Sequence, residues 1–309
     1  MRIAVMGAGG VGGYFGARLA RGGADVVFIA CGAHLEAMRK HGLRIENEHK
    51  PIELPKVHAT DDPSSIGRVD LILFAVKLWD TVSAAQLLLP ALGPETGLIS
   101  FQNGVQKDDM LRPIVGGAAL MGGVGYVATA ISRPGVIAQT GTMQRLLFGE
   151  FEGRRSKRVE DFHEACVAGG INAEISADIR REIWQKFVFL VALSGATTSM
   201  RMPLGPIRDN PLTRQFFLDL MKEVVAVGRA HGIALPADYA EQRMNFVDSL
   251  PRDMIASMYH DLQQGKPLEL AWLSGGVVDL GTAMGVPTPM NRAVRDVLQL
   301  HVPGRRERI

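Results

Sequence analysis

One stretch near the N-terminus decides the fold of this chain: Arg2-Ile3-Ala4-Val5-Met6-Gly7-Ala8-Gly9-Gly10-Val11-Gly12. The apolar run predicts a buried strand, and the G-x-G-x-x-G pattern after it opens a helix predicted over 10–21. A second strand is predicted over 25–30, so the pattern has the strand-helix-strand context that gives it meaning. Gly7 permits a tight turn, Gly9 lets backbone approach a diphosphate, and Gly12 allows close helix packing. The sequence therefore predicts a dinucleotide site made by Gly7, Ala8, Gly9, Gly10, Val11 and Gly12.

The two halves of the chain differ in their hydrophobic period. In the first half, further strands are predicted over 69–76, 97–101 and 119–124, β-like runs over 135–138 and 145–148, and a helix over 81–89. After Ile175 helices are predicted over 179–200, 211–231, 236–248, 251–264, 268–284 and 289–300, with Asn210 and Thr288 as N-caps. We expect an α/β Rossmann-type doubly wound sheet in residues 1–176 and an all-α domain in residues 177–309.

Composition excludes several classes of protein. The 309 residues are 47% apolar and 21% charged, as in a soluble globular protein. A net charge of +2 is too small for capture of a nucleic-acid backbone, so no nucleic-acid partner is expected. The uncharged run 114–132 is punctuated by glycines and favours strands over a membrane span. The eight histidines show no metal-ligand spacing, so no metal is expected. The presence of only two cysteines and a predicted strand directly after Met1 favour a cytoplasmic protein.

The residue at the end of the second predicted strand normally indicates which cofactor is bound. Asp or Glu there binds the free ribose hydroxyl of NAD, and a nearby Arg binds the 2′-phosphate of NADP. Cys31 occupies that position, so neither signal is present. Two ligand-binding candidates stand at the ends of later strands. Lys77 and Asn103 follow the strands over 69–76 and 97–101, and the carboxyl ends of parallel strands are where such sheets bind ligands.

Five separated motifs in order resemble the ketopantoate reductase (2-dehydropantoate 2-reductase) family over almost the whole chain. They are Gly7-x-Gly9-x-x-Gly12, Ala75-Val76-Lys77-Leu78-Trp79-Asp80, Phe101-Gln102-Asn103-Gly104-Val105, Glu182-Ile183-Trp184-Gln185-Lys186-Phe187, and Ser257-Met258-x-x-Asp261 leading to Glu269. The resemblance implies reduction of the 2-oxo acid ketopantoate to pantoate, in pantothenate biosynthesis, with NADPH. It also implies a homodimer formed through the helical domain.

The resemblance assigns roles to individual residues. Lys77, Asn103 and Ala128 would contact the cofactor, Lys186 would be the catalytic general acid, and Ser257 and Glu269 would face the substrate, with Asn103 and Lys186 beside it. The chemistry suits these residue types, because hydride transfer to a ketone leaves negative charge on oxygen that a cationic donor can stabilise and protonate. We expect Lys186 to reach across an interdomain cleft to the nicotinamide, with Glu269 holding its ammonium group or a substrate hydroxyl.

The sequence departs from the family at several expected site positions. Leu190 and Ser194, on the predicted helix face of Lys186, and Met254 stand where asparagines are typical. These changes predict a more apolar substrate site, so a less polar 2-ketone is an alternative substrate. Cys31 stands where typical members carry an arginine, which predicts a weaker preference for NADPH over NADH, unless Arg39 or Arg18 takes over.

Two further alternatives stay open at this point. A non-catalytic, nucleotide-binding redox sensor would keep the glycine loop without turnover. Another two-domain dehydrogenase, acting on 3-hydroxy acids or sugar acids, would share the loop but not the five motifs.

Overall fold

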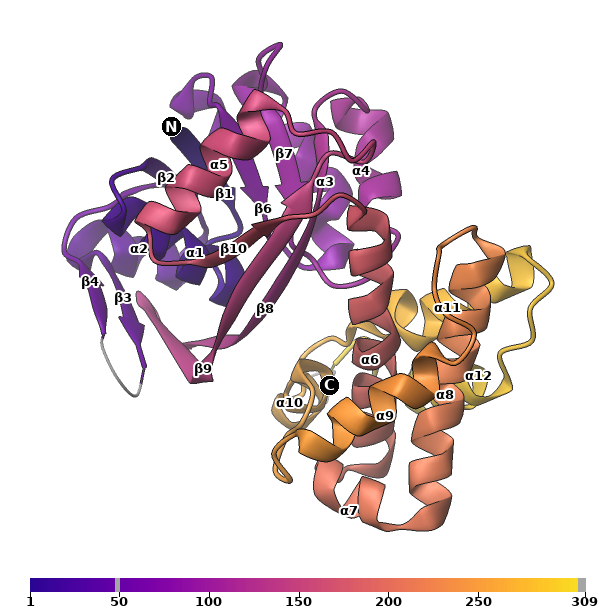
Figure 1. Ribbon diagram of the computed structural model, residues 1–309. Helices are drawn as coiled ribbons and strands as arrows, with labels where there is room; N and C mark the ends of the chain where they lie inside the picture. Colours follow the sequence, from indigo (N-terminus) through magenta and orange to yellow (C-terminus); the bar gives the residue numbers. More distant parts are fainter. Residues whose placement is uncertain (48–50, 305–309) are drawn as a thin grey trace. The chain divides into compact units, whose positions relative to one another are not determined.

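A computed structural model describes residues 1–47 and 51–304 of the chain (Figure 1). The chain divides into two compact units, one formed by Met1–Asn103 with Lys107–Glu182 and the other by Gly104–Gln106 with the chain from Ile183 onward. This division cuts helix α6 (Ile179–Met200), whereas the change of sequence period placed the boundary near residue 176. The domain limits 1–176 and 177–309 therefore stay a prediction.

The first unit is built on a ten-stranded sheet. Its strands are β1 (Arg2–Met6), β2 (Asp25–Ile29), β3 (Leu43–Glu46), β4 (Ile52–Leu54), β5 (His58–Thr60), β6 (Leu71–Phe74), β7 (Gly97–Ser100), β8 (Leu120–Arg133), β9 (Val136–Gly149) and β10 (Asn172–Ile175). The succession β5-β2-β1-β6-β7-β8 is parallel throughout, in the strand order of a Rossmann sheet. The predicted α/β fold class of this half is thus confirmed.

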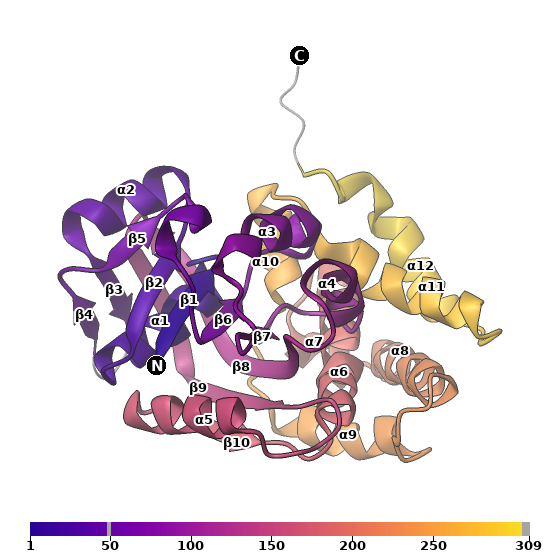
Figure 2. The same ribbon diagram turned by 90° about the horizontal axis from the view of Figure 1, so that it is seen from above.

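Side-chain alternation along the central strands gives the sheet two buried faces. In β1, Ile3 and Val5 join one core cluster, while Ala4 and Met6 join the other. The first cluster includes side chains of α1 (Gly10–Arg21) and α5 (Lys157–Ala168), among them the buried Cys166. The second includes α3 (Thr81–Leu87) and α4 (Lys107–Val115), and Figure 2 shows α5 on the opposite side of the sheet from these two helices. The sheet is therefore doubly wound.

Several short elements of this unit had no sequence signal that we used. They are α2 (Gly32–His41), α4, α5 and the strands β3, β4, β5 and β10. The four strands have only three or four residues each, too few to show a clear period. The β-like runs 135–138 and 145–148 were wrong as separate elements, because both belong to β9, whose pairing with β8 is irregular between them.

The second unit is helical, as predicted. After α6 come α7 (Leu204–Asp209), α8 (Pro211–Ala230), α9 (Tyr239–Ser249), α10 (Ser257–Gln264), the 3-10 turn η4 (Glu269–Trp272), α11 (Ser274–Ala283) and α12 (Pro289–Leu298). The single helix predicted over 268–284 was wrong, because the backbone of Leu273 turns to φ −96° and ψ −108° and separates η4 from α11. The helix predicted over 251–264 begins only at Ser257.

The two predicted N-caps behave differently. The Asn210 side chain accepts hydrogen bonds from the amides of Leu212 and Thr213, which confirms it as the cap of α8. Thr288 makes no capping bond with its side chain. The free amides at the N-terminus of α12 are instead satisfied by α8. The Glu223 carboxylate accepts from the amides of Met290 and Asn291 at 2.7 and 2.9 Å. A distant carboxylate therefore replaces the local cap.

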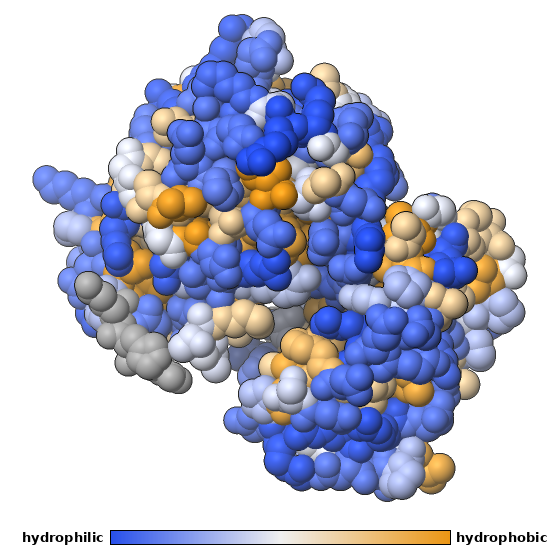
Figure 3. Space-filling model, viewed as in Figure 1, coloured by the Kyte–Doolittle hydropathy of each residue, from blue (hydrophilic) through white to orange (hydrophobic). Residues whose placement is uncertain are grey.

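The molecular surface carries no large exposed apolar face on the side drawn in Figure 3, where hydrophilic residues dominate and apolar residues form small groups. Within residues 1–47 and 51–304, no helix has both the length and the apolar character needed to cross a membrane.

Candidate active site

Three neighbouring parallel strands end at one edge of the sheet in the first unit. Met6 of β1 pairs with Phe74 of β6, and Phe74 pairs with Ser100 of β7. The residues that follow these strands, including Gly7, Lys77 and Asn103, therefore leave the sheet at the same edge. This is the edge at which open parallel sheets bind their ligands. The structure thus brings together the cofactor-contact candidates taken from three separate motifs.

The glycine loop has the geometry that its pattern requires. Gly7 has a φ of +90°, and a Cβ there would lie 2.8 Å from the amide nitrogen of Val76. A Cβ on Gly12 would collide with the Gly7 carbonyl oxygen. Gly9 differs from both, because nothing lies within 4 Å of where its Cβ would be. Gly7 and Gly12 are thus required by the fold itself, while Gly9 leaves open space that suits a diphosphate.

Strand β8 packs against the N-terminus of α1 beside this loop. A Cβ on Gly10 would lie 2.6 Å from the Thr129 carbonyl oxygen and 3.1 Å from Thr129 Oγ1. That hydroxyl is buried and has no hydrogen-bond partner among the described residues. Ala128 is exposed and stands at an irregularity in the β8–β9 pairing, between Val127 and Thr129. The open loop, the helix N-terminus and the unpaired hydroxyl together fit a bound dinucleotide.

A buried amide joins two of the loops at this edge. Gln102 Nε2 donates to Val76 O at 3.0 Å and to Thr81 Oγ1 at 2.8 Å, and its Oε1 accepts from Ser100 Oγ at 3.0 Å. These bonds fix the chain on either side of Lys77 and directly before Asn103. The sequence analysis quoted Gln102 within a motif but gave it no role. Its position one residue before the Asn-Gly pair was the only available signal.

A buried ion pair bonds the end of strand β7, just before the loop that carries Gln102 and Asn103. Lys107 Nζ donates to Ser100 O at 2.7 Å and lies 3.3 Å from both carboxylate oxygens of Asp108, and both side chains are buried. Burial lowers the pKa of Lys107 and raises the pKa of Asp108, and each partner opposes the shift of the other. No sequence signal that we used pointed to this pair, because its burial depends on the packing of α4 against the sheet.

The cofactor-specifying end of β2 is occupied by Cys31, which is exposed. The two arginines considered as substitutes are engaged elsewhere. Arg39 donates to Asp61 at 2.9 Å and to Ala59 O at 3.2 Å, at the end of the neighbouring strand β5. Arg18 lies in the last turn of α1, at the end of the helix opposite the glycine loop, and donates to Tyr14 Oη and Gly170 O. Both arginines thus have hydrogen-bond partners within the first unit.

The remaining predicted residues belong to the second unit. Lys186 lies on α6 and is partly buried, Ser257 is exposed as the first residue of α10, and Glu269 is buried at the start of η4. Leu190 and Met254 are partly buried against the helical core. Ser194 is only 1% exposed, and its hydroxyl has no partner among the described residues. The second unit therefore keeps an amine at Lys186 and a buried carboxylate at Glu269, while Leu190 and Met254 are apolar.

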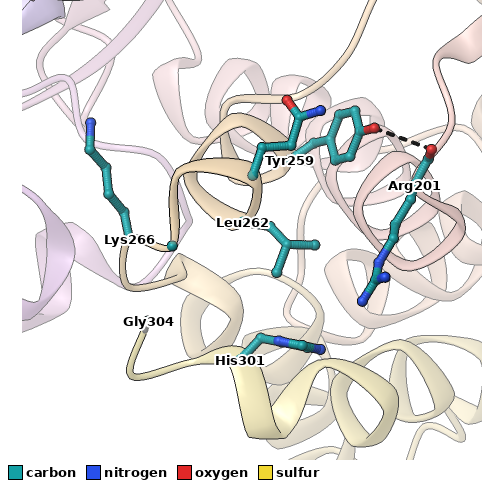
Figure 4. Close-up of a pocket in the computed structure, with 8 residues that line it drawn as sticks. Arg201, Tyr259, Leu262, Lys266, His301 and Gly304 are labelled. Atoms are coloured by element: carbon teal, nitrogen blue, oxygen red, sulfur yellow. Dashed lines mark hydrogen bonds between the residues drawn. The ribbon is translucent and has the colours of Figure 1, made fainter. Parts of the chain in front are cut away.

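Two cavities that lie within single units contain none of the predicted site residues. In the second unit, a cavity of about 540 Å³ is bordered by Arg201, Leu262 and His301, and Tyr259 donates there to Arg201 O at 3.2 Å (Figure 4). In the first unit, a groove of about 1100 Å³ lies at the amino ends of the strands, lined by Met1, Ala24 and Asp70 among others. Among the side chains that the structure describes, no group of three potential ligands is arranged to hold a metal ion.

A Rossmann sheet with an open glycine loop, followed by a helical unit that carries a lysine and a buried glutamate, defines an NAD(P)-dependent oxidoreductase. Comparison with known families makes this more specific. The ketopantoate reductase PanE/ApbA family pattern matches residues 3–153, and the ketopantoate reductase PanE/ApbA C-terminal pattern matches residues 178–301. The chain belongs to the ketopantoate reductase family.

Individual relatives match the chain from end to end. An uncharacterized oxidoreductase, YkpB, from Bacillus subtilis is 30% identical over 97% of this chain and 99% of its own length. The 2-dehydropantoate 2-reductase of Mesorhizobium japonicum is 31% identical over 95% of each chain. The crystal structure of a PanE/ApbA family ketopantoate reductase from Ralstonia eutropha superposes with a TM-score of 0.88 at 34% identity, covering 97% of this chain and 98% of that one. The family assignment made from the five motifs is thus confirmed.

Proposed function

We propose that this protein reduces 2-oxo acids with a nicotinamide cofactor, and that 2-dehydropantoate (ketopantoate) is its first substrate and NADPH its first cofactor. The observation that carries the proposal is that both halves of the chain match one reductase family while the glycine loop keeps an open diphosphate position at Gly9. The homodimer, the cytoplasmic location and the role in pantothenate biosynthesis are predictions that accompany this proposal.

In the proposed reaction, different residues bind the cofactor, protonate the product and bind the substrate. The amides of Gly9 and Gly10 would hold the diphosphate, while Lys77, Asn103 and Ala128 would hold the nicotinamide half. The bound cofactor supplies a hydride to the carbonyl carbon of the substrate. Lys186 Nζ would stabilise the charge that develops on the carbonyl oxygen and give that oxygen a proton. Glu269 would bind the lysine ammonium or a substrate hydroxyl, beside Ser257.

A second candidate substrate class follows from the second unit. Leu190 and Met254 present apolar side chains where amides were expected, and Ser194 is sealed in the core. Each neutral hydrogen bond that a polar substrate cannot make is worth about 0.5–1.5 kcal/mol. A 2-oxo acid with a larger or less polar side chain is therefore the alternative to ketopantoate.

Steady-state kinetics with a panel of 2-oxo acids, using NADPH and NADH in parallel, tests both candidates. Ketopantoate should give the highest kcat/KM, and preference for an aryl or branched apolar 2-oxo acid would replace it with the alternative class. Lys186→Ala should lower kcat by about 100-fold or more while cofactor binding persists. Lys222→Ala, on the exposed surface of α8, is the matched control and should leave kcat unchanged. Cofactor binding by the wild type without any turnover would instead favour a nucleotide-binding sensor.

A further inference from the structure

His34, the third residue of α2, makes two hydrogen bonds that together fix its tautomer. Its Nδ1 lies 3.1 Å from the amide nitrogen of Gly135, and its Nε2 lies 3.0 Å from the carbonyl oxygen of Ala8. The Gly135 amide can only donate, so Nδ1 must accept and the ring proton must be on Nε2. The neutral ring therefore accepts from the turn between β8 and β9 and donates to the glycine loop. We name this pair of bonds the His34 bridge.

The His34 bridge sets the direction of one peptide group in the glycine loop. The Ala8 amide is held by Ile29 O at 3.1 Å, and the Ala8 carbonyl is held by the His34 ring. All peptide bonds in the described chain are trans, and in a trans peptide the C=O and the following N–H point in opposite directions. With the Ala8 carbonyl turned toward His34, the Gly9 N–H must point away from α2. Among the described residues, no protein group accepts a hydrogen bond from that amide.

The other end of the bridge is rigid. Gly135 has a φ of +77°, a conformation that favours glycine, and its carbonyl accepts from the Arg44 amide of β3 at 3.0 Å. A Cβ at this position would lie only 3.1 Å from Ala37 Cβ of α2. The turn is thus packed against α2 and bonded to the sheet, so it offers the His34 ring a fixed point from which to hold the loop.

We propose that His34 is a positioning residue for cofactor binding, which presents the Gly9 amide to the diphosphate by holding the Ala8 carbonyl. This inference rests on the proposed function, because it takes the glycine loop as the dinucleotide site. The bond to Ala8 matters for cofactor affinity, whereas the bond to Gly135 only anchors the ring. The two bonds therefore predict different outcomes when they are removed one at a time.

Two substitutions separate the bonds. In His34→Asn the side-chain oxygen takes the place of Nδ1 and can accept from Gly135, but nothing reaches Ala8. In His34→Gln the side-chain nitrogen takes the place of Nε2 and can donate to Ala8. We expect His34→Asn and His34→Ala to raise the Kd of NADPH and NADH by about threefold to tenfold, and His34→Gln to stay within about twofold of the wild type. Fluorescence titration of both reduced cofactors measures these Kd values for the wild type and the three variants, and kcat at saturating cofactor should change little.

His163→Ala is the matched control, because His163 Nε2 also contacts a backbone carbonyl, that of Ala173 on β10, away from the glycine loop. It should leave both Kd values unchanged. Equal Kd values for His34→Asn, His34→Gln and the wild type would overturn the inference while leaving the proposed function intact, as would equal losses in His34→Asn and His34→Gln. Failure of the wild type to bind either cofactor would overturn the proposed function and this inference together.

Discussion

Gln102 Nε2 lies 2.8 Å from Thr81 Oγ1, and this contact links the loop after β7 to the first residue of α3. The same nitrogen bonds the Val76 carbonyl, so one amide group connects the segments on both sides of Lys77. Gln102 and Thr81 are both buried, so water does not compete for these hydrogen bonds. The loops that carry Lys77 and Asn103 are thus held together by the buried Gln102 side chain.

Replacement of Gln102 by leucine should destabilise the protein. The change leaves the Val76 carbonyl and the Ser100 hydroxyl without their buried partner, which costs about 1–3 kcal/mol in free energy of unfolding. Urea denaturation followed by circular dichroism measures this difference. Gln215→Leu is the control, because Gln215 is exposed on α8 and bonds only Asp219, and it should change the free energy of unfolding by less than about 0.5 kcal/mol. Equal stabilities of Gln102→Leu and the wild type would contradict this reading of the network.

The glycines of the loop should respond differently to the addition of one methyl group. Gly12→Ala forces a Cβ against the Gly7 carbonyl and should destabilise the fold by about 1–3 kcal/mol. Gly9→Ala meets no protein atom, and the φ of −73° at Gly9 suits alanine, so stability should hold. The added methyl occupies the diphosphate position and should raise the cofactor Kd by about tenfold or more. Thermal denaturation and cofactor titration of both variants check this, and unchanged affinity in Gly9→Ala would argue against a diphosphate there.

Cys31→Arg should shift cofactor preference toward NADPH. A guanidinium at the end of β2 can form a bidentate pair with a 2′-phosphate, which a thiol cannot, so the ratio of KM for NADH to KM for NADPH should rise by about tenfold. Cys31→Ser is the neutral control and should leave the ratio unchanged. If the ratio does not move in Cys31→Arg, the 2′-phosphate is bound by other residues.

The free energy of unfolding should fall in mildly acidic solution because of His34. Burial lowers the pKa of His34 below its ordinary value of 6.5, while the bond to the Ala8 carbonyl acts in the opposite sense. A lowered pKa in the folded state means that the stability supplied by the neutral ring is complete above pH 6.5 and is lost as the pH falls through the folded-state value. Protonation places an N–H opposite the Gly135 N–H and breaks the anchor of the His34 bridge.

Several charged groups on the elements around His34 have partners of opposite charge, while Glu36, Lys40 and His41 of α2 are exposed. Arg133 of β8 and Arg44 of β3 pair with Glu46, and Arg39 of α2 pairs with Asp61, while the glycine loop itself carries no charge. Urea denaturation between about pH 5 and pH 8 should therefore show a lower free energy of unfolding at the acidic end in the wild type. The decline should be absent in His34→Gln, and the same decline in both proteins would assign it to another group.

The strength of each sequence signal explains which parts of the structure could be predicted. The strand at Arg2–Met6 and the helices at Gly10–Arg21 and Ile179–Met200 were predicted with the bounds that the structure gives, because long apolar runs and glycine punctuation are local signals. The break at Leu273 could not be predicted, because it depends on a backbone conformation that no local residue demands. Strand β3 has the sequence Leu43-Arg44-Ile45-Glu46 and is recognisable through its pairing with β9 and β4.

The candidate site divides in the same way. Gly7, Gly9 and Gly12 could be found from spacing, and the structure shows why each must be small or open. His34, Gln102 and Thr129 could not, because a histidine three residues into a helix or a threonine within a strand has many uses. His34 depends on Ala8 and Gly135, 26 and 101 residues away, and Gln102 on Val76 and Thr81, while Thr129 stands out through its approach to Gly10. Such long-range contacts exist only once the sheet has formed.

The two cysteines lie in opposite surroundings, and this makes the chain convenient for spectroscopy. Cys31 is exposed, while burial within the α5 core raises the pKa of Cys166 and withholds its thiolate from reagents. A maleimide dye should therefore attach once to the folded protein, at the end of β2, without any engineered change. A second attachment would report unfolding around Cys166. The native chain thus supplies a labelling site at the end of β2 and an internal test of its own folded state.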